Sequence, residues 1–212
     1  MRKIILLTIG FLLTLPLSAQ ATDQINNKPA NADVGIDVQR AQSYLRGLTT
    51  IQANFIQRAH NGSNLTGTFY LKRPGRLRFE YNETDDFVVA DGIFIYFYDS
   101  ELKEQSNAPI GQTLADFLLR KNLSLTDDLR VKDVQKQANH KVITLAQKGD
   151  EGAGQVKLFF TQTPYVLQKW QVIDAAGLTT EIILSNMQRD VNLPASLFAY
   201  IAPKQDKPNY NE

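Results

Sequence analysis

Hydrophobic residues alternate with polar ones through most of the chain after residue 50, and turn residues interrupt this alternation at short intervals. A two-residue period places the apolar side chains of a strand on one face of a sheet. Strands joined by tight turns such as Asn61-Gly62, Pro74-Gly75 and Asp91-Gly92 are typical of an antiparallel meander. The predicted strands cover residues 50–58, 65–73, 77–82, 86–90, 93–98, 130–137, 141–147, 155–161, 166–173 and 178–187. This regular spacing predicts a mainly β protein with one large antiparallel sheet that is strongly curved or barrel-like.

Two segments have helical spacing instead. From Asp37, a plausible N-cap, Val38, Ala41 and Leu45 fall on one helical face and predict an amphipathic helix. Residues 110–120 show the same spacing and predict a second helix inside the β region. This second helix could pack permanently on the sheet or cover a ligand cavity as a removable lid, and its periodicity fits both alternatives.

An arginine stands where the apolar stripe of one strand should continue. Counting by twos from Leu65 gives Phe69, Leu71 and then Arg73, so a guanidinium points toward the hydrophobic face. Its five donors could bind free carbonyls at a nearby helix end. Alternatively, the side chain could extend along the rim into solvent.

The segment Ile93 to Tyr98 has apolar or aromatic residues at both its odd and its even positions. A strand with one face in water should alternate, so both sides of this strand need cover. The cover could be protein on both sides, or protein on one side and an apolar ligand on the other.

The chain ends predict the compartment and the domain organisation. Arg2 and Lys3 precede an uncharged run and then the small residues Ala19 and Ala21, which predicts a cleaved secretory signal over residues 1–21. Residues 22–36 are polar and predict a flexible leader. Residues 37–202 then form a single domain, and residues 203–212 form a polar tail.

Composition argues against several function classes. The chain has no cysteine, so it has neither disulfides nor thiolate chemistry, and removal of Arg2 and Lys3 would leave a net charge of about −1, with no basic excess for nucleic acid. His60 and His140 are the only histidines, and no metal-binding spacing occurs. No serine-nucleophile elbow or phosphate-binding glycine loop is present. We therefore expect a binding protein without metal or cofactor, and not an enzyme.

Four motifs follow one another in order: Ala53-Asn54-Phe55-Ile56-Gln57, Gly67-Thr68-Phe69-Tyr70-Leu71-Lys72-Arg73-Pro74, Leu77-Arg78-Phe79-Glu80-Tyr81 and Val89-Ala90-Asp91-Gly92. This set resembles the periplasmic outer-membrane lipoprotein carriers of the Lol pathway, the LolA family. The resemblance covers residues 37–202 and is strongest between residues 53 and 100. It departs from the family at Tyr96, where members often have tryptophan; the only tryptophan here is Trp170.

The resemblance implies an unclosed antiparallel half-barrel of about eleven strands, with helices that form a lid over an apolar cavity for acyl chains. By this analogy, Arg73 is a latch whose hydrogen bonds to the lid favour the closed, empty state. The candidate cavity residues are Leu65, Phe69, Leu71, Leu77, Phe79, Tyr81, Ile93, Ile95, Phe97, Leu114, Phe117 and Leu118.

The resemblance also implies partners and a location. The expected cargo is an acylated lipoprotein, received from an inner-membrane ABC-type releasing complex and passed to an outer-membrane acceptor. The carrier itself is expected to be a periplasmic monomer.

Three other functions remain open. The half-barrel could carry a phospholipid or glycolipid for another exporter, or sense envelope stress through a similar lipid-binding barrel. An enzyme that acts on acyl esters is disfavoured, because the sequence lacks a nucleophile-base motif.

Overall fold

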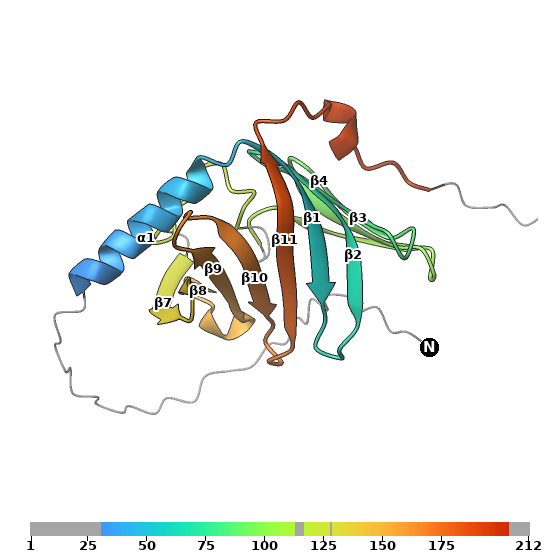
Figure 1. Ribbon diagram of the computed structural model, residues 1–212. Helices are drawn as coiled ribbons and strands as arrows, with labels where there is room; N and C mark the ends of the chain where they lie inside the picture. Colours follow the sequence, from blue (N-terminus) through green and yellow to red (C-terminus); the bar gives the residue numbers. More distant parts are fainter. Residues whose placement is uncertain (1–30, 113–116, 128, 204–212) are drawn as a thin grey trace, which may run out of the picture.

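The computed structural model describes residues 31–112, 117–127 and 129–203 (Figure 1). Its first element is α1 (Asn31–Arg46), which carries an acidic residue, Asp33, in its first turn and a basic one, Arg46, in its last. Both charges are favourable to the helix dipole. The helix packs with Val38, Ala41 and Leu45 buried. Within the described ranges, no helix is long and apolar enough to cross a membrane.

The helix begins before the predicted residue, so the leader prediction is wrong for residues 31–36. Asp37 lies inside α1 and forms a salt bridge with Lys141 (Oδ2 to Nζ, 2.7 Å) instead of capping the helix. The predicted signal peptide, residues 22–30 of the leader and residues 204–212 of the tail lie outside the described residues.

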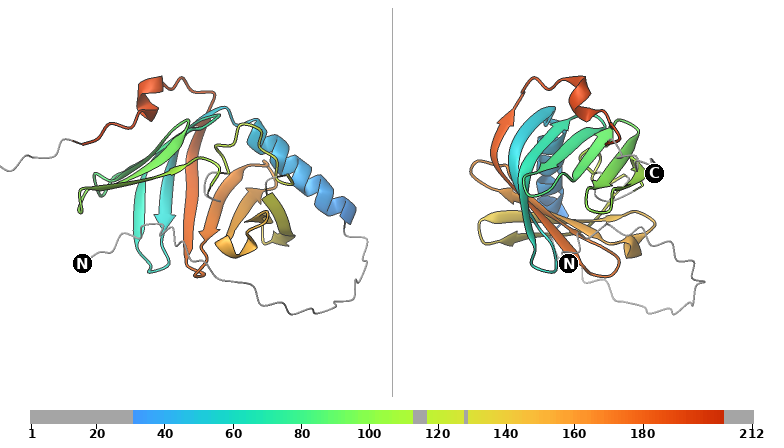
Figure 2. Two further views of the ribbon diagram at one scale, coloured as in Figure 1. Left: turned by 180° about the vertical axis from the view of Figure 1, so that it is seen from behind. Right: turned by 90° about the vertical axis from the view of Figure 1, so that its right-hand side faces the viewer.

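Eleven antiparallel strands form one sheet in the order β6-β5-β4-β3-β2-β1-β11-β10-β9-β8-β7. The strands are β1 (Thr50–Arg58), β2 (Asn64–Lys72), β3 (Arg76–Tyr81), β4 (Phe87–Asp91), β5 (Phe94–Asp99), β6 (Glu104–Pro109), β7 (Leu129–Gln137), β8 (His140–Gln147), β9 (Gln155–Thr161), β10 (Leu167–Ile173) and β11 (Thr179–Arg189). The first and last strands pair in the middle of the sheet, with Phe55 opposite Leu184. Strands β6 and β7 remain as separate edges, so the sheet curves into an unclosed half-barrel (Figures 1 and 2). This confirms the predicted fold class.

Strand β6 is the one strand that the alternation did not predict. Its sequence, Glu-Gln-Ser-Asn-Ala-Pro, has no apolar stripe, and residues 104–107 are exposed. It is an edge strand, so its pairing with β5 depends on backbone hydrogen bonds and not on a buried face. Sequence periodicity cannot detect such a strand.

The predicted second helix is wrong in the described part of residues 110–120. Residues 110–112 and 117–119 form turns or bends. Gly111 has a φ of +100°, and the Leu119 carbonyl accepts the amide of Gly75 (2.9 Å) instead of an amide in a following helical turn. The apolar spacing is real, because Phe117 and Leu118 are buried, but contacts with the sheet replace the helical hydrogen bonds.

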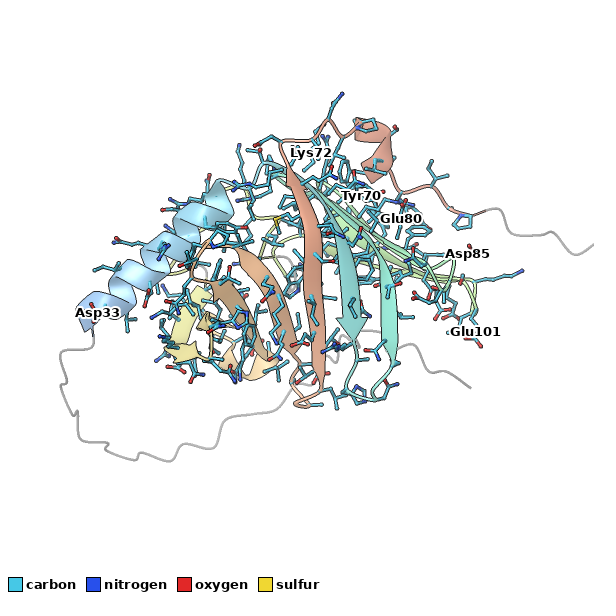
Figure 3. The ribbon with its side chains drawn as sticks, viewed as in Figure 1. Asp33, Tyr70, Lys72, Glu80, Asp85 and Glu101 are labelled. Carbon is cyan, nitrogen blue, oxygen red and sulfur yellow. The ribbon has the colours of Figure 1, made fainter. Side chains whose placement is uncertain are left out.

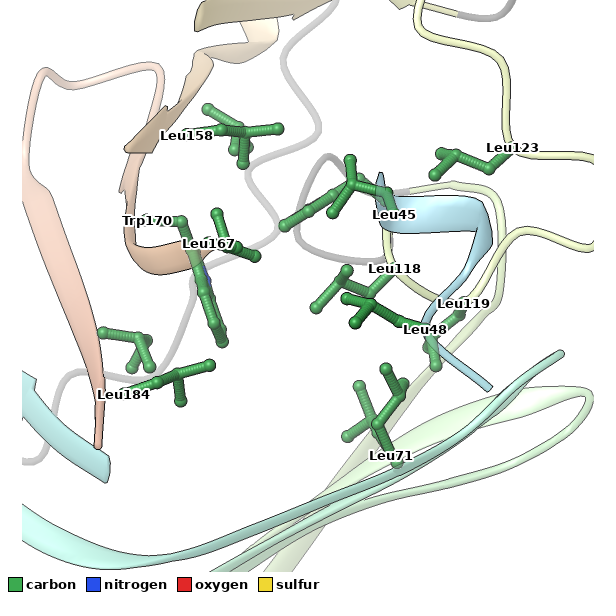
Figure 4. Packing of buried hydrophobic residues seen from close by; sticks show 14 of the residues in the cluster. Leu45, Leu48, Leu71, Leu118, Leu119, Leu123, Leu158, Leu167, Trp170 and Leu184 are labelled. Carbon is green, nitrogen blue, oxygen red and sulfur yellow. The ribbon is translucent and has the colours of Figure 1, made fainter. Parts of the chain in front are cut away.

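The hydrophobic core lies on the concave face of the sheet, under α1 and residues 117–127. Figure 4 shows leucines from these two segments, among them Leu45 and Leu118, facing Leu71 and Trp170 of the sheet. Trp170 in β10 is in edge contact with Phe69 of β2 (5.9 Å between ring centroids) and with Phe117 (6.1 Å). The two halves of the sheet and the segment above it therefore share one core.

The C-terminal segment covers part of the opposite, convex face. Within it, η3 (Ala195–Phe198) contacts β3 and β4, and Phe198 is buried. Lys72, on the convex face of β2 (Figure 3), donates from Nζ to the Leu193 carbonyl (2.7 Å). The Tyr200 ring stacks on Tyr96 of β5 (4.4 Å between centroids). Other parts of the protein therefore cover both faces of β5, which explains why its apolar residues point to both faces.

A second short helix, η2 (Glu151–Ala153), precedes β9.

Candidate functional site: the Arg73 junction

The turn between β2 and β3 brings three parts of the chain together. The Arg73 amide donates to the Thr49 carbonyl (2.8 Å), and the Gly75 amide donates to Leu119. Gly75 has a φ of +79°, and a Cβ added there would lie 3.0 Å from the Cα of Gly92 in the β4–β5 turn. Only glycine suits this position without strain, so the turn can pack tightly against its neighbours.

The Arg73 guanidinium binds backbone carbonyls from two separate segments. Its NH1 donates to the Leu45 carbonyl and its NH2 donates to the Arg120 carbonyl (2.8 Å). Leu45 lies in the last turn of α1, where carbonyls lack a partner within the helix. Of the two sequence alternatives for Arg73, the structure contains the bond to a helix end.

Arg73 is a half-buried cation without a carboxylate partner among the described residues. Burial lowers the pKa of its guanidinium, and the nearby charge of Arg46 lowers it further, although arginine remains charged near neutral pH. Its Nε is buried and has no hydrogen-bond partner in the described part of the chain. Two neutral carbonyls thus hold a desolvated charge, which is a weaker arrangement than a carboxylate would give.

Further hydrogen bonds join α1 to residues 117–127, and we call these two segments the lid. Arg46 donates from Nε to the Leu123 carbonyl (2.7 Å), and the Leu125 amide donates to Gln42 Oε1 (2.9 Å). Arg73 adds one bond to each part of the lid. These polar contacts surround the apolar interface between lid and sheet.

Most of the predicted cavity residues meet in the core between the lid and the sheet. Seven of them are buried together: Phe69, Leu71, Leu77, Phe79, Ile95, Phe117 and Leu118. Tyr81 and Phe97 are partly buried against this cluster. The Tyr81 hydroxyl donates to Gln57 Oε1 (2.9 Å), and burial raises the pKa of this phenol.

The structure does not place all the predicted residues there. Ile93 is 68% exposed, so its assignment to the cavity is wrong; it lies in the turn before β5, where strand alternation does not yet apply. Leu65 is only partly buried and lies outside the core cluster, near the end of β2 remote from Arg73. Leu114 lies outside the described residues.

The sequence-based list also omitted the contribution of β8 to β11. The core includes Trp170 and further apolar residues of these strands: Ile143, Leu145, Val156, Leu158, Phe160, Leu167, Ile182 and Leu184. In β9 and β11 these residues share one parity, which was a usable signal, whereas residues 142–146 of β8 are all buried and do not alternate. Alternation within a strand does not show that both halves of the sheet face the same lid.

The resulting site is apolar inside and fastened by polar contacts at its rim. No group of three or more His, Cys, Asp or Glu side chains in the described ranges could hold a metal ion. The side chains of the interior are apolar, so it can bury apolar groups. At present the lid's own side chains occupy that interior.

Comparison with known proteins finds a matching family model, similar sequences and a similar solved structure. Residues 46–201 match the family model described as outer membrane lipoprotein carrier protein LolA. The outer-membrane lipoprotein carrier protein of Legionella pneumophila (strain Paris) is 30% identical over 172 residues, which is 77% of this chain and 84% of that protein. The protein of the same name from Dechloromonas aromatica (strain RCB) is 29% identical and covers 95% of this chain and 93% of its own length. A crystal structure of a LolA superfamily protein from Nitrosomonas europaea aligns with a TM-score of 0.47 and 11% identity, over 78% of this chain and 97% of that one.

Proposed function

The chain belongs to the outer membrane lipoprotein carrier protein LolA family, and we propose that it carries lipoproteins by enclosing their acyl chains between the lid and the half-barrel. The role of lipoprotein carrier follows from the family. The observation that supports the acyl-chain site is the continuous apolar core between two layers that are fastened at the rim by Arg73.

Acyl chains need such a site because their exposure to water is costly. Burial of a methylene contributes about 0.8 kcal/mol, and a triacylated N-terminus has on the order of 40 methylenes, so its exposure costs about 30 kcal/mol in total. A lipoprotein therefore cannot cross an aqueous compartment unaccompanied. Burial against Trp170, Phe69 and their neighbours would offset most of this cost.

Cargo binding must displace the lid, because lid side chains such as Leu45 and Phe117 now fill the interior. Displacement breaks the bonds from Arg73 to Leu45 and Arg120. Each lost bond weakens cargo holding by about 1–3 kcal/mol, since the half-buried guanidinium then lacks its acceptors. Arg73 is thus a latch that favours the closed, empty state and promotes release.

The protein works as a periplasmic monomer without a cofactor. It receives lipoproteins from an inner-membrane ABC-type complex and passes them to an outer-membrane acceptor. It is a carrier and not an enzyme.

A spheroplast release assay tests the function. The added mature protein should release outer-membrane-directed lipoproteins from the inner membrane, and Arg73→Leu should accept cargo but transfer it several-fold more slowly to acceptor membranes, because the latch is absent. Arg76→Leu, the same chemical change three residues away, should transfer normally. Failure of the wild-type protein to release lipoproteins would disprove the carrier role, whereas normal transfer by Arg73→Leu would disprove only the latch.

The main alternative is a shuttle for a phospholipid or glycolipid, which the same apolar interior could hold. Mass spectrometry of ligand that copurifies with the protein distinguishes the two. An acylated peptide supports the lipoprotein cargo, and a free lipid without peptide supports the alternative.

A further inference from the structure

A hollow of about 360 Å³ lies on the convex face of β7 to β10, away from the lid. Its floor consists of Val142 and Phe159, which have the opposite parity to the core residues Ile143 and Leu158 and pair across β8 and β9. The C-terminal segment, which covers β3 and β4, does not cover this hollow in the described chain. The hollow is thus a separate feature from the acyl-chain site.

The side chains around the hollow are mainly cations and hydrogen-bond donors. Lys157 and Lys169 contribute two ammonium groups, and Gln135, Gln137 and Gln171 contribute amides. The floor residues are buried, so an aromatic or aliphatic ligand would find little apolar surface there. A ligand with negative charge and several acceptor atoms fits this lining better.

The two lysines differ in their present partners. Lys169 donates from Nζ to Glu181 Oε2 (2.7 Å) and lies 4.4 Å from the centre of the Phe159 ring. Glu181 is also bound by Gln171 (2.9 Å) and lies 3.5 Å from Arg58, so this carboxylate is already shared. Lys157, by contrast, forms no salt bridge with any described residue. Its charge remains available to a carboxylate from outside.

The span of the hollow indicates how large the ligand is. The lining crosses four neighbouring strands, β7 to β10, which are about 4.8 Å apart, so it spans about 14 Å. That length matches about four residues of extended polypeptide. Glutamine amides can both donate to and accept from the peptide groups of such a segment.

We propose that this hollow binds a short acidic segment of polypeptide, whose carboxylate pairs with Lys157 while its backbone contacts the glutamines. Lys157 and the glutamines come from strands that do not contribute Arg73, so this proposal does not depend on the latch. It identifies the partner by its chemistry: an extended, carboxylate-bearing stretch of a protein.

The test is an NMR titration of the full mature protein with hexaglutamate and hexaglutamine peptides. Hexaglutamate should shift the amide signals of β7 to β10 and not those of the lid, and hexaglutamine should have little effect. Lys157→Gln should weaken hexaglutamate binding by about two- to fivefold, the size of one exposed charge pair of about 0.4–1 kcal/mol. Lys136→Gln, which removes the same charge from an exposed residue of β7 outside the hollow, should leave the affinity unchanged.

Any of three results of these titrations would overturn the proposal: hexaglutamate shifts confined to other strands, equal weakening by both lysine variants, or equal binding of hexaglutamine. A further titration with inorganic phosphate adds a fourth such result. If phosphate at the same concentration displaces hexaglutamate, the hollow binds small anions and not peptide, and the proposal is wrong.

Discussion

Arg73 and Glu181 are charged side chains that the same sheet holds in opposite ways. Arg73, at the concave rim, binds neutral carbonyls of Leu45 and Arg120, which belong to the lid and not to the sheet. Glu181, on the convex face, binds Lys169 of the adjacent strand and lies beside Arg58 of the other adjacent strand. A charge that is paired between neighbouring strands is fixed as long as the sheet is folded. A charge that joins the sheet to a separate layer can lose its partners while the sheet remains intact.

The largest expected effect concerns Glu181, whose partners lie on neighbouring strands. Glu181→Ala should lower the free energy of unfolding by about 2–3 kcal/mol, because it leaves Lys169 without its closest partner at a largely buried position. Urea denaturation measures this loss. Glu80→Ala removes a more exposed carboxylate that pairs with Arg78 and should cost less than about 1 kcal/mol. Equal losses in the two variants would contradict the distinction between fixed and exposed pairs.

The second largest effect concerns Arg73, whose hydrogen-bond partners belong to the lid. Arg73→Leu should increase hydrogen exchange about tenfold at the Gly75 amide, which joins the sheet to the lid, and at the Leu125 amide, which joins the two parts of the lid; this corresponds to about 1.4 kcal/mol in the opening equilibrium. Amides in the centre of the sheet, such as that of Phe55, should exchange at their wild-type rate. Uniform acceleration across lid and sheet would show that Arg73 stabilises the whole fold and not the closed lid.

The smallest effect is the pH dependence that Glu181 contributes. Burial raises the pKa of the Glu181 carboxyl, but hydrogen bonds from Lys169 and Gln171, with the charges of Lys169 and Arg58, outweigh burial and hold this pKa below its usual range. A depressed folded-state pKa means that the stabilisation is fully present above the unfolded-state pKa of about 4.3 and is lost as pH falls through the folded-state value.

The stability difference between wild type and Glu181→Gln should therefore be constant near neutral pH and should shrink as pH falls below about 4.3. Urea midpoints at neutral and acidic pH measure it, and the other carboxylates cancel because both proteins contain them. A difference that stays constant into strong acid would contradict the depressed pKa.

The sequence predicted strands better than it predicted what covers them. The alternation in β1 and β9 gave their bounds: β1 buries Ile51, Ala53 and Phe55 on one face, and β9 alternates up to Leu158, before Phe159 is buried on the other face. It did not predict β6, whose pairing relies on backbone bonds, and it predicted a helix at residues 110–120 that the described part does not form. For residues 110–120 the deciding contacts come from residues distant in sequence, such as Gly75 for the Leu119 carbonyl, whereas β6 pairs with its neighbour β5 through the backbone, which leaves no side-chain pattern.

The candidate site divides in the same way. Phe69, Leu71 and Phe79 could be assigned to the apolar interior because alternate residues of a strand share a face. Arg73 stood out because it is a charged residue at the next position of the same apolar stripe. Trp170 could not be assigned, because its contact with Phe69 and Phe117 depends on the curvature that brings β10 toward β2 and the lid. The hollow on the convex face was also missed, since it depends on how side chains of four neighbouring strands pack together, which the pattern of a single strand does not show.

The sequence by itself determined that this chain forms a curved antiparallel sheet with one apolar face and an arginine at its edge, because side-chain direction in a strand follows from a local two-residue period. Only the tertiary structure decided which carbonyls accept hydrogen bonds from that arginine. It also decided that α1 begins at Asn31 and that residues 117–127 complete the lid without helical geometry in the described part. These features depend on free-energy differences between alternative partners for the same backbone groups. Such differences are set by residues far apart in the chain, so no local pattern contains them.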